Sequence, residues 1–260
     1  MMNRFSQFGI FVLLFLTACG GIPALNPTAT SAPTDTPQPT LTPLPTDTAT
    51  PVPTATPDVT STAAAKATEA AESVLGELDK LLKELDVQYK DGHLAWQQTK
   101  PLSIELSGPD DQVLAVDDTL TSGNFILKSD VTWTASGIIL CGAAFRSEPD
   151  LEKGKQYRFI FLRLSGLPAW EIDVFEFGQY RNSPTDTKFS GALDQGNGAT
   201  NQFVLVAQDD QFNLFINQHH EGRFFDFSKQ RTQGSFAFLG FQDSGKGTCE
   251  FENSWVWTLD

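Results

Sequence analysis

The sequence predicts an all-β domain, an antiparallel jelly-roll sandwich of two sheets, preceded by a disordered Thr/Pro-rich linker and one amphipathic helix. From Leu94 onwards, short apolar segments with a period of two residues follow one another, and turn signals separate them. No convincing helical window lies between these segments. Evenly spaced strands without crossover helices are typical of an antiparallel sandwich or jelly roll. Most of the 21 phenylalanines belong to this part and can fill the layer between two sheets.

The N-terminal segment, residues 1–19, resembles a bacterial lipoprotein signal peptide. Arg4 precedes an apolar run that ends at Leu16, and small residues lead from there to Cys19. The run is shorter than the roughly 20 residues that a membrane-spanning helix needs, which favours a cleaved signal peptide over an uncleaved membrane helix. The resemblance implies that Cys19 carries a lipid. The protein would then be extracytoplasmic, with the lipid on Cys19 anchoring it to the cell membrane or cell surface.

The composition of residues 20–62 predicts a disordered linker. Thr, Pro, Ala and Ser dominate this segment, in units such as those at 37–40 and 51–54. It lacks the aromatic and branched apolar residues that offset the entropy of ordering, and its prolines favour an extended chain. At about 3.1 Å per residue the linker would span roughly 130 Å when fully extended. That reach is enough to carry a domain through a cell-wall layer.

Residues 63–90 predict an amphipathic helix, because apolar residues recur at alternating spacings of three and four. The stripe consists of Ala64, Ala67, Ala71, Val74, Leu78, Leu81 and Leu85. Two interpretations remain open. The stripe is either a short coiled coil, which would form a weak oligomer through residues 64–85, or a face that packs against the following domain. Leu75 and Leu82 widen the apolar face beyond a narrow seam, and this favours packing on the domain.

The succession of strand-like segments in residues 91–260 predicts the jelly-roll domain. Its clearest strand segments are 125–128, 137–145, 156–164, 203–207, 212–217, 235–241 and 251–259. Two cysteines remain besides Cys19, and both lie in apolar alternating segments. Outside the cytoplasm such a pair predicts a disulfide between Cys141 and Cys249, with two separate buried thiols as the alternative.

Several short segments of this domain follow one another in a familiar order. They are residues 137–140, 145–146, 157–159, 201–205, 214–217 and 251–257. The set is similar to concanavalin A-like lectin/glucanase sandwiches, the laminin-G-like jelly rolls of bacterial surface proteins and of the 3-keto-disaccharide hydrolase family. The resemblance implies the fold but leaves the activity open among lectins, hydrolases and adhesive modules. In such domains a turn ending in Asn-Gly is usual, whereas Gln218 and His219 follow Asn217 here. The sequence therefore does not decide whether this tight turn forms.

The charge of the chain argues against a nucleic-acid partner. The formal net charge is −14. From Asp91 onwards the chain has 23 acidic and 13 basic side chains, and the basic ones are scattered singly along the sequence. Neutralising a phosphate backbone needs a basic patch, which this sequence does not offer. The same balance argues against direct docking on an anionic membrane surface, so the lipid would provide the membrane contact.

The strand-like segment 171–176 carries the sharpest candidate for chemistry. In a strand, Glu171 and Asp173 share a face, and a one-residue bulge at Phe175 would return Glu176 to that face. This spacing resembles the catalytic strand of laminarinase-like glucanases. The resemblance implies Glu171 as nucleophile, Glu176 as acid/base and Asp173 as assisting carboxylate, with the two catalytic carboxyls about 5–5.5 Å apart. Without the bulge, Phe175 joins the acids and Glu176 turns away, leaving an exposed acidic strand that keeps the sheet soluble.

Sugar recognition without catalysis would use an aromatic platform and a planar polar group, for which Trp133, Trp170 and Arg146 are the candidates. No cofactor and no metal site is predicted. Calcium is an alternative at adjacent aspartates without a defined ligand spacing, namely Asp110, Asp111, Asp117 and Asp118, or Asp209 and Asp210. The pair His219 and His220 lacks a third zinc ligand in a recognisable pattern, and His93 is far away in sequence.

Taken together, the sequence predicts a lipid-anchored surface domain that binds a glycan or another cell-envelope component without catalysis. Two alternatives remain open. One is a retaining glycoside hydrolase that acts through Glu171 and Glu176. The other is a purely structural or adhesive module.

Overall fold

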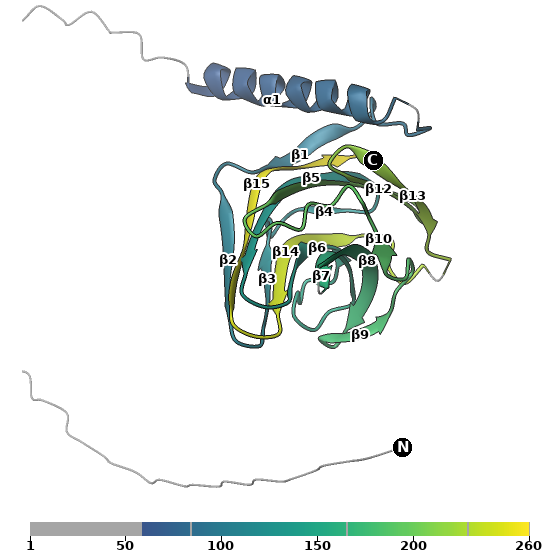
Figure 1. Ribbon diagram of the computed structural model, residues 1–260. Helices are drawn as coiled ribbons and strands as arrows, with labels where there is room; N and C mark the ends of the chain where they lie inside the picture. Colours follow the sequence, from purple (N-terminus) through teal and green to yellow (C-terminus); the bar gives the residue numbers. More distant parts are fainter. Residues whose placement is uncertain (1–58, 84, 165, 228, 260) are drawn as a thin grey trace, which may run out of the picture. The chain divides into compact units, whose positions relative to one another are not determined.

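The computed structural model describes residues 59–83, 85–164, 166–227 and 229–259 (Figure 1). The described part begins with helix α1 (Val59–Leu81), and fifteen strands follow it. The strands are β1 (His93–Gln97), β2 (Leu102–Ser107), β3 (Asp110–Ala115), β4 (Thr121–Ser122), β5 (Phe125–Ala135), β6 (Ile139–Ser147), β7 (Gln156–Leu164), β8 (Leu167–Glu176), β9 (Gln179–Asn182), β10 (Lys188–Phe189), β11 (Thr200–Gln208), β12 (Gln211–Ile216), β13 (His219–Phe225), β14 (Gly234–Gln242) and β15 (Lys246–Thr258). The predicted signal peptide and residues 20–58 of the predicted linker lie outside the described residues. Within the described residues, α1 is not apolar enough to cross a membrane.

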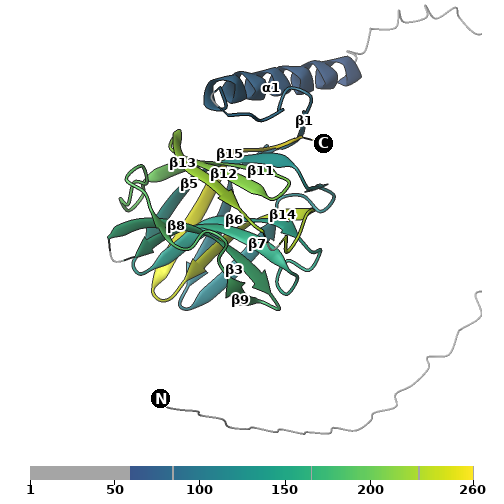
Figure 2. The ribbon, with the colours of Figure 1, turned by 90° about the vertical axis from the view of Figure 1, so that its right-hand side faces the viewer.

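The strands form two antiparallel sheets that pack face to face (Figures 1 and 2). Sheet A has the order β1-β15-β5-β11-β12-β13, and β2 also pairs with β15. Sheet B has the order β10-β8-β7-β6-β14-β3, with β4 on β14 and β9 on β8. Strands that are distant in sequence are neighbours, as where β15 lies between β1 and β5. The predicted all-β jelly-roll sandwich is confirmed.

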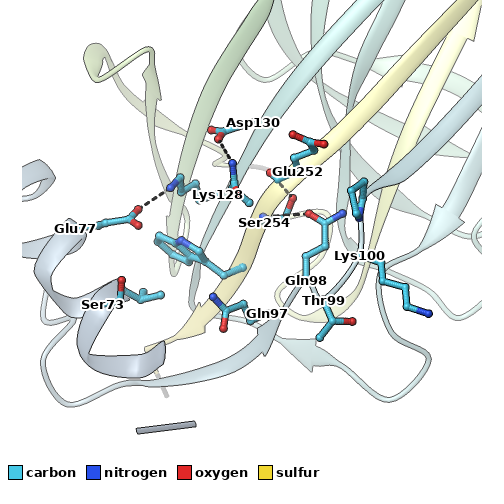
Figure 3. A pocket seen from close by; sticks show the side chains of 14 residues that line it. Ser73, Glu77, Gln97, Gln98, Thr99, Lys100, Lys128, Asp130, Glu252 and Ser254 are labelled. Atoms are coloured by element: carbon cyan, nitrogen blue, oxygen red, sulfur yellow. Dashed lines mark hydrogen bonds and ion pairs between the residues drawn. The ribbon is translucent and has the colours of Figure 1, made fainter. Parts of the chain in front are cut away.

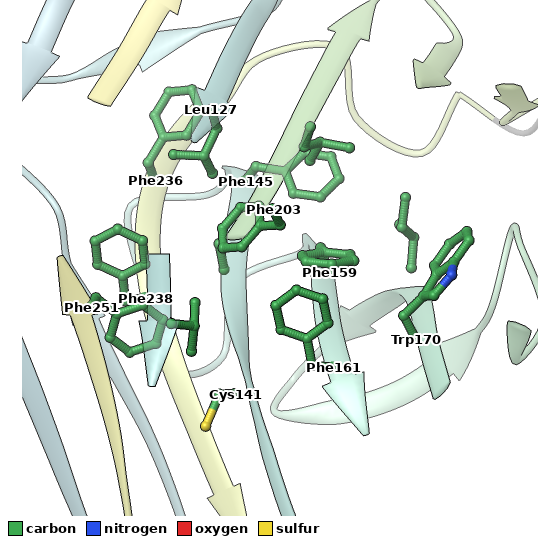
Figure 4. Close-up of a cluster of buried hydrophobic side chains, with 14 of the residues drawn as sticks. Leu127, Cys141, Phe145, Phe159, Phe161, Trp170, Phe203, Phe236, Phe238 and Phe251 are labelled. Carbon is green, nitrogen blue, oxygen red and sulfur yellow. The ribbon is translucent and has the colours of Figure 1, made fainter. Parts of the chain in front are cut away.

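A layer of aromatic side chains fills the space between the sheets (Figure 4). In β7 the period of two residues places Tyr157, Phe159 and Phe161 in this layer, whereas Arg158 faces outwards. The ring of Phe203 from sheet A lies 4.9 Å from that of Phe159, centre to centre, and closes the layer from the other side. Such aromatic pairs stabilise the core beyond the simple burial of area.

Cys141 of β6 and Cys249 of β15 form a disulfide that joins the two sheets. Their Cα atoms are 5.7 Å apart, within the usual range for a disulfide, and the two residues are separated by 108 positions in the sequence. Both are fully buried in the core. The predicted pairing is confirmed.

Helix α1 packs on the outer face of sheet A. Its residues Val74 and Leu78, with Leu82 just beyond its end, are buried against Trp255 and Trp257 of β15. The Glu77 carboxylate reaches the Lys128 ammonium of β5 at 2.6 Å. The structure therefore agrees with the interpretation of a helix packed on its domain. Ala64 and Ala67 of the predicted stripe are exposed, and an oligomer through residues 64–85 stays a prediction.

The bounds of α1 differ from the predicted 63–90. The helix begins at Val59, within the predicted linker, and ends at Leu81. Beyond it the chain turns back, because Val87 and Tyr89 join the apolar cluster under the helix. The Tyr89 hydroxyl donates to Asp79 of the helix, and Trp257 Nε1 donates to the Tyr89 carbonyl at 2.9 Å. These tertiary contacts outweigh the helical propensity of residues 82–90.

The tight turn between β12 and β13 forms although glycine is missing. Ile216 pairs with His219, so only Asn217 and Gln218 connect the strands. Both residues have positive φ angles, 48° and 68°, which is the backbone of the two-residue turns that match the twist of a hairpin. The Asn217 side chain accepts from the Gln202 amide at 2.8 Å and donates to the Ala192 carbonyl at 2.7 Å. These bonds hold Asn217 in a conformation that it tolerates better than most residues.

Candidate functional site

Strand β8 presents two acidic side chains on the outer face of sheet B. Ile172 and Val174 lie in the core between the sheets, so Glu171 and Asp173 point outwards. In the pairing with β7, Glu171 is opposite Ile160 and Asp173 is opposite Arg158. The two carboxylates thus share a face, as the alternation of the sequence predicts.

Asp173 is only 3% exposed although it lies on an outer face. Burial, followed by the negative charge of Glu171, raises the pKa of Asp173 to about 8. Its Oδ1 atom is buried and has no hydrogen-bond partner among the described residues. The carboxyl of Asp173 also has side-chain hydrogen bonds with Ser183 and Glu171, and protonation lets it donate to the Glu171 carboxylate.

Arg158 of β7 compensates part of the negative charge. Its guanidinium lies 4.1 Å from the ring centre of Phe175, and its Nη1 atom lies 3.2 Å from Oδ2 of Asp111 in β3. Strands β6 and β14 separate β7 from β3 in sheet B, so this ion pair reaches across the outer face. Arg158 thus interacts with Asp111, while its charge also partly opposes the rise in the pKa of Asp173.

Tyr180 of β9 completes this group of residues. It is paired with Phe175, and the two rings meet edge to face with their centres 6.3 Å apart. Tyr180 is 57% exposed. Its pKa is raised, first by loss of solvent and then by the charges of Asp173 and Glu171. We call Arg158, Glu171, Asp173, Phe175 and Tyr180 the Asp173 cluster.

The segment that links β9 to β10 fixes the edge of this cluster. The amide of Ile172 donates to Thr185 Oγ1, and Ser183 Oγ donates to the Ile172 carbonyl, both at 2.9 Å. Next to them, Thr187 Oγ1 donates to Oε2 of Glu171 at 2.6 Å. The segment therefore satisfies the free edge of β8 and holds the Glu171 side chain in one position.

Glu176 does not join the other two acids. The pairing of β7 with β8 runs without a shift up to Phe175, and the bulged residue is Arg181 in β9. Phe175 therefore takes the next outward position, and Glu176 turns to the other side, where it forms ion pairs with Lys155 and Arg181. Five residues of strand separate Glu171 from Glu176 by about 16 Å along the chain. A retaining glycosidase needs about 5–5.5 Å between its carboxyls, so the predicted catalytic pair does not form.

The two candidate tryptophans are core residues. Trp133 and Trp170 are each 1% exposed, and Figure 4 shows Trp170 within the buried cluster. Trp133 Nε1 donates to the Gly196 carbonyl at 2.9 Å, and Trp170 Nε1 donates to Glu221 at 3.2 Å. Neither indole offers a face to a sugar, so the prediction of an aromatic platform from these residues is wrong. A period of two residues sorts side chains onto two faces but does not say which face meets the other sheet.

Arg146 is buried as well, at 2% exposure. It lines a pocket of about 370 Å³ together with Asp209, Asp210 and Lys229. Its Nε and Nη2 atoms both donate to the Gly123 carbonyl, at 2.9 and 2.7 Å. The guanidinium thus holds the main chain of a neighbouring loop, and this use of its donors argues against the predicted bidentate contact with a ligand.

A second pocket, of about 410 Å³, lies between α1 and sheet A (Figure 3). The ion pair of Glu77 and Lys128 stands in its wall. Gln98 bonds to the bulge of β15: its main-chain N–H donates to the Ser254 carbonyl at 2.8 Å, and its side-chain Oε1 accepts from the Ser254 main-chain N–H at 3.2 Å. These side chains are engaged in joining the helix and the β1–β2 connection to sheet A.

Several of the aspartates and histidines considered as metal ligands have other roles. Asp111 pairs with Arg158, and Asp117 accepts from the Thr119 amide and hydroxyl. His219 lies against Glu221 at 3.3 Å, and the ring of His220 packs on Phe215. Over the described ranges, no group of three or more Cys, His, Asp or Glu residues is arranged to hold a metal ion.

Sequence reasoning missed Arg158, Tyr180 and the role of Asp111. The alternation of 157–159 places Arg158 on the opposite face of its strand from Tyr157 and Phe159. Its contact with Asp111, however, depends on the order of strands in sheet B. Strands β7 and β3 are 41 residues or more apart in sequence, and two other strands lie between them in the sheet. Tyr180 reaches the acids through the hairpin of β8 and β9, whose register the sequence did not reveal.

Known proteins resemble this chain in fold only. No protein-family model and no curated protein matches its sequence. Among solved structures, the carbohydrate-binding module CBM66 from Bacillus subtilis has a TM-score of 0.46 and 19% identity, covering 58% of this chain and 84% of that one. A Bacillus licheniformis β-glucanase has a TM-score of 0.40 and 9% identity, with coverages of 62% and 81%. Sheep galectin-11 has a TM-score of 0.39 and 10% identity, with coverages of 58% and 98%.

These neighbours are concanavalin A-like jelly rolls, and they include both binding proteins and a hydrolase. At TM-scores below 0.5 and identities below 20%, the likeness does not bear on what this chain binds or whether it is an enzyme.

Proposed function

We propose that this protein is a lipid-anchored, extracytoplasmic glycan-binding protein without hydrolytic activity, and that the Asp173 cluster is its binding site. The observation that carries the proposal is the exposed ring of Tyr180, which meets Phe175 edge to face, on the outer face of the sheet that also presents the Glu171 carboxylate. Both belong to the outer face of sheet B, whereas α1 packs on sheet A.

The chemistry of this cluster suits a sugar. Sugar rings have apolar C–H faces that stack on aromatic rings, and hydroxyl groups that donate to carboxylates and accept from guanidinium groups. Tyr180 supplies the exposed ring, with Phe175 beside it, and Glu171 supplies the acceptor. A binding role rather than a catalytic one is supported by Phe175, which takes the outward position where a third carboxylate would be needed.

Replacing Tyr180 by Ala is expected to weaken glycan binding about three- to tenfold, because an aromatic contact contributes roughly 0.5–1.5 kcal/mol. The measurement is isothermal titration of the full-length protein in detergent with hexasaccharides of glucose, glucosamine and galacturonic acid. Phe227→Ala is the matched control, because this ring is highly exposed but belongs to the segment after β13. If none of the hexasaccharides binds, or if both variants lose affinity equally, the proposed site is wrong. Reducing ends released during incubation would contradict a non-catalytic role.

Replacing Cys19 by Ser is expected to move the protein from the membrane fraction to the soluble fraction. Serine cannot carry a thioether-linked lipid, and α1 is not apolar enough to cross a membrane. Fractionation of cells that produce the wild type and the variant, followed by immunoblotting, gives the answer. Full retention of the Cys19→Ser protein in membranes would contradict the lipid anchor.

A further inference from the structure

We infer that the groove between α1 and sheet A is a second binding site, and that it takes a sugar residue carrying a carboxylate, of which glucuronic acid is the simplest case. The groove consists of the cavity of about 410 Å³ (Figure 3) and a neighbouring one of about 430 Å³. Glu77, Lys128 and Trp255 line both cavities. Each volume is within the range of small-molecule sites. The groove lies on sheet A, whereas the Asp173 cluster lies on sheet B, so the inference does not depend on the proposed function.

The indole of Trp255 is the first argument. Trp255 is 3% exposed, and its Nε1 atom is buried without a hydrogen-bond partner among the described residues. Buried polar atoms almost always have a partner, and leaving one unpaired is costly. Trp257, two residues further along β15, shows the usual case, because its Nε1 donates to the Tyr89 carbonyl. Trp255 therefore keeps a donor for an acceptor that enters the groove.

The ammonium group of Lys128 is the second argument. Lys128 is directly opposite Trp255 in the pairing of β5 with β15, and its Nζ atom lies 6.0 Å from the centre of the indole ring. The Lys128 side chain is only 10% exposed, yet Glu77 is the single acceptor that the described residues give its three donors. Two neighbouring groups thus offer N–H donors, and one of them is charged. Hydrogen bonds from a charged donor to a carboxylate are about twice as strong as neutral ones.

The carboxylate of Glu77 marks the position that a ligand would take. Its Oε2 atom lies 2.6 Å from Lys128 Nζ, so a carboxylate fits there, as Figure 3 shows. The Glu77 side chain is 46% exposed, and its carboxylate can be hydrated again when another one takes over Lys128. Because Glu77 lines both cavities, its displacement joins them and opens the way to Trp255. A ligand carboxylate has two oxygens and no tether to α1, so it can accept from Lys128 and Trp255 together.

The lining of the groove changes from donors to acceptors along β5. Asp130 follows Lys128 by two residues on the same face of the strand, and it pairs with Glu252 of β15. Both acids line the cavity of 410 Å³. Asp130 accepts from the amides of Gln202 and Asn253, and Glu252 is exposed. These carboxylates repel a second negative charge but accept from hydroxyl groups. A uronic acid, with one carboxylate and several hydroxyls, matches this order.

The test compares methyl β-glucuronide with methyl β-glucoside, which differ only by a carboxylate in place of a hydroxymethyl group. Full-length protein labelled with ¹⁵N is titrated in detergent at pH 7, and the indole N–H resonance of Trp255 reports occupancy of the groove. We expect the glucuronide to shift this resonance in a saturable manner and to bind about tenfold more tightly than the glucoside. High salt should reduce the preference.

Trp255→Phe keeps an aromatic ring and removes the unpaired donor. It should weaken glucuronide binding about five- to tenfold without lowering the melting temperature, because no bond within the protein is lost. Trp257→Phe is the matched control: it loses the bond to Tyr89, so it should lower the melting temperature and leave glucuronide binding unchanged. Broadening of the ligand's own resonances gives the affinities of these variants without the indole signal.

Glu77→Gln removes the competing carboxylate and should tighten glucuronide binding several-fold. A purely structural ion pair predicts the opposite, because its loss would only loosen α1. Equal binding of the two glycosides, absence of binding by the glucuronide, unchanged affinity in Trp255→Phe or weaker binding in Glu77→Gln each overturns the inference. Tyr180→Ala, which tests the proposed function, should leave glucuronide binding in the groove as it is, so the two sites stand or fail separately.

Discussion

Replacing Cys141 and Cys249 together by Ala is expected to lower the free energy of unfolding by about 4–5 kcal/mol. The disulfide closes a loop of 108 residues, and closing so long a loop removes much conformational freedom from the unfolded chain. It also joins β6 of sheet B to β15 of sheet A, so its loss weakens the contact between sheets. Domains of this size are commonly stable by only about 5–15 kcal/mol, so the variant should be close to its unfolding threshold at 37 °C.

Urea denaturation followed by tryptophan fluorescence measures this effect, because Trp133 and Trp170 are buried in the core. Wild-type protein treated with a reductant that reaches the bond should unfold at the same lowered urea concentration as the double variant. The reductant should not change the double variant further. An unchanged midpoint in both experiments would show that the bond contributes little to stability.

Replacing Leu78 by Ala is expected to detach α1 from sheet A. Leu78 is fully buried between Val74 and the indoles of β15, and truncating a buried leucine costs about 2–5 kcal/mol. The helix contacts the domain through few residues. We therefore expect the loss to exceed the free energy that holds the helix on sheet A. Faster amide hydrogen exchange in residues 64–81 and a red shift of the emission of Trp255 and Trp257 should report the detachment.

Glu72→Ala is the matched control, because Glu72 lies on the exposed side of the same helix. It should leave hydrogen exchange in α1 and the tryptophan emission unchanged. The alternative of a coiled coil gives a different result: Leu78→Ala would then lower the molecular mass in solution and leave the emission of Trp255 and Trp257 as it was. Mass by light scattering separates the two interpretations.

The pattern of residues was enough to predict those features that depend on local periodicity. Strand β7 has the predicted bounds 156–164, because its residues 156–159 alternate between polar and apolar and the next residues run apolar. The segment 125–128 was predicted too short, since β5 continues to Ala135 through polar residues that are paired with β11 and β15. Polar residues give little strand signal in the sequence, and the hydrogen bonds of two neighbouring strands are what keep them extended.

The candidate site was predicted in part. That Glu171 and Asp173 share a face follows from the period of a strand, which is a property of the backbone. Whether Glu176 joins them depends on a bulge, and a bulge is placed by the pairing with neighbouring strands. Here the pairing of β8 with β7 has no register shift, and the bulge lies in β9 at Arg181.

By itself, the sequence determined the all-β class, the face shared by Glu171 and Asp173 and the apolar stripe of α1, and it predicted the disulfide between Cys141 and Cys249 that the structure confirms. Only the tertiary structure decided which face of each strand is buried, and so put Trp133 and Trp170 in the core. It also decided that Arg158 meets Asp111 across two strands and that α1 covers sheet A. The physical reason is that periodicity is encoded within a few residues, whereas burial and ion pairing depend on which distant strands become neighbours in the sheets.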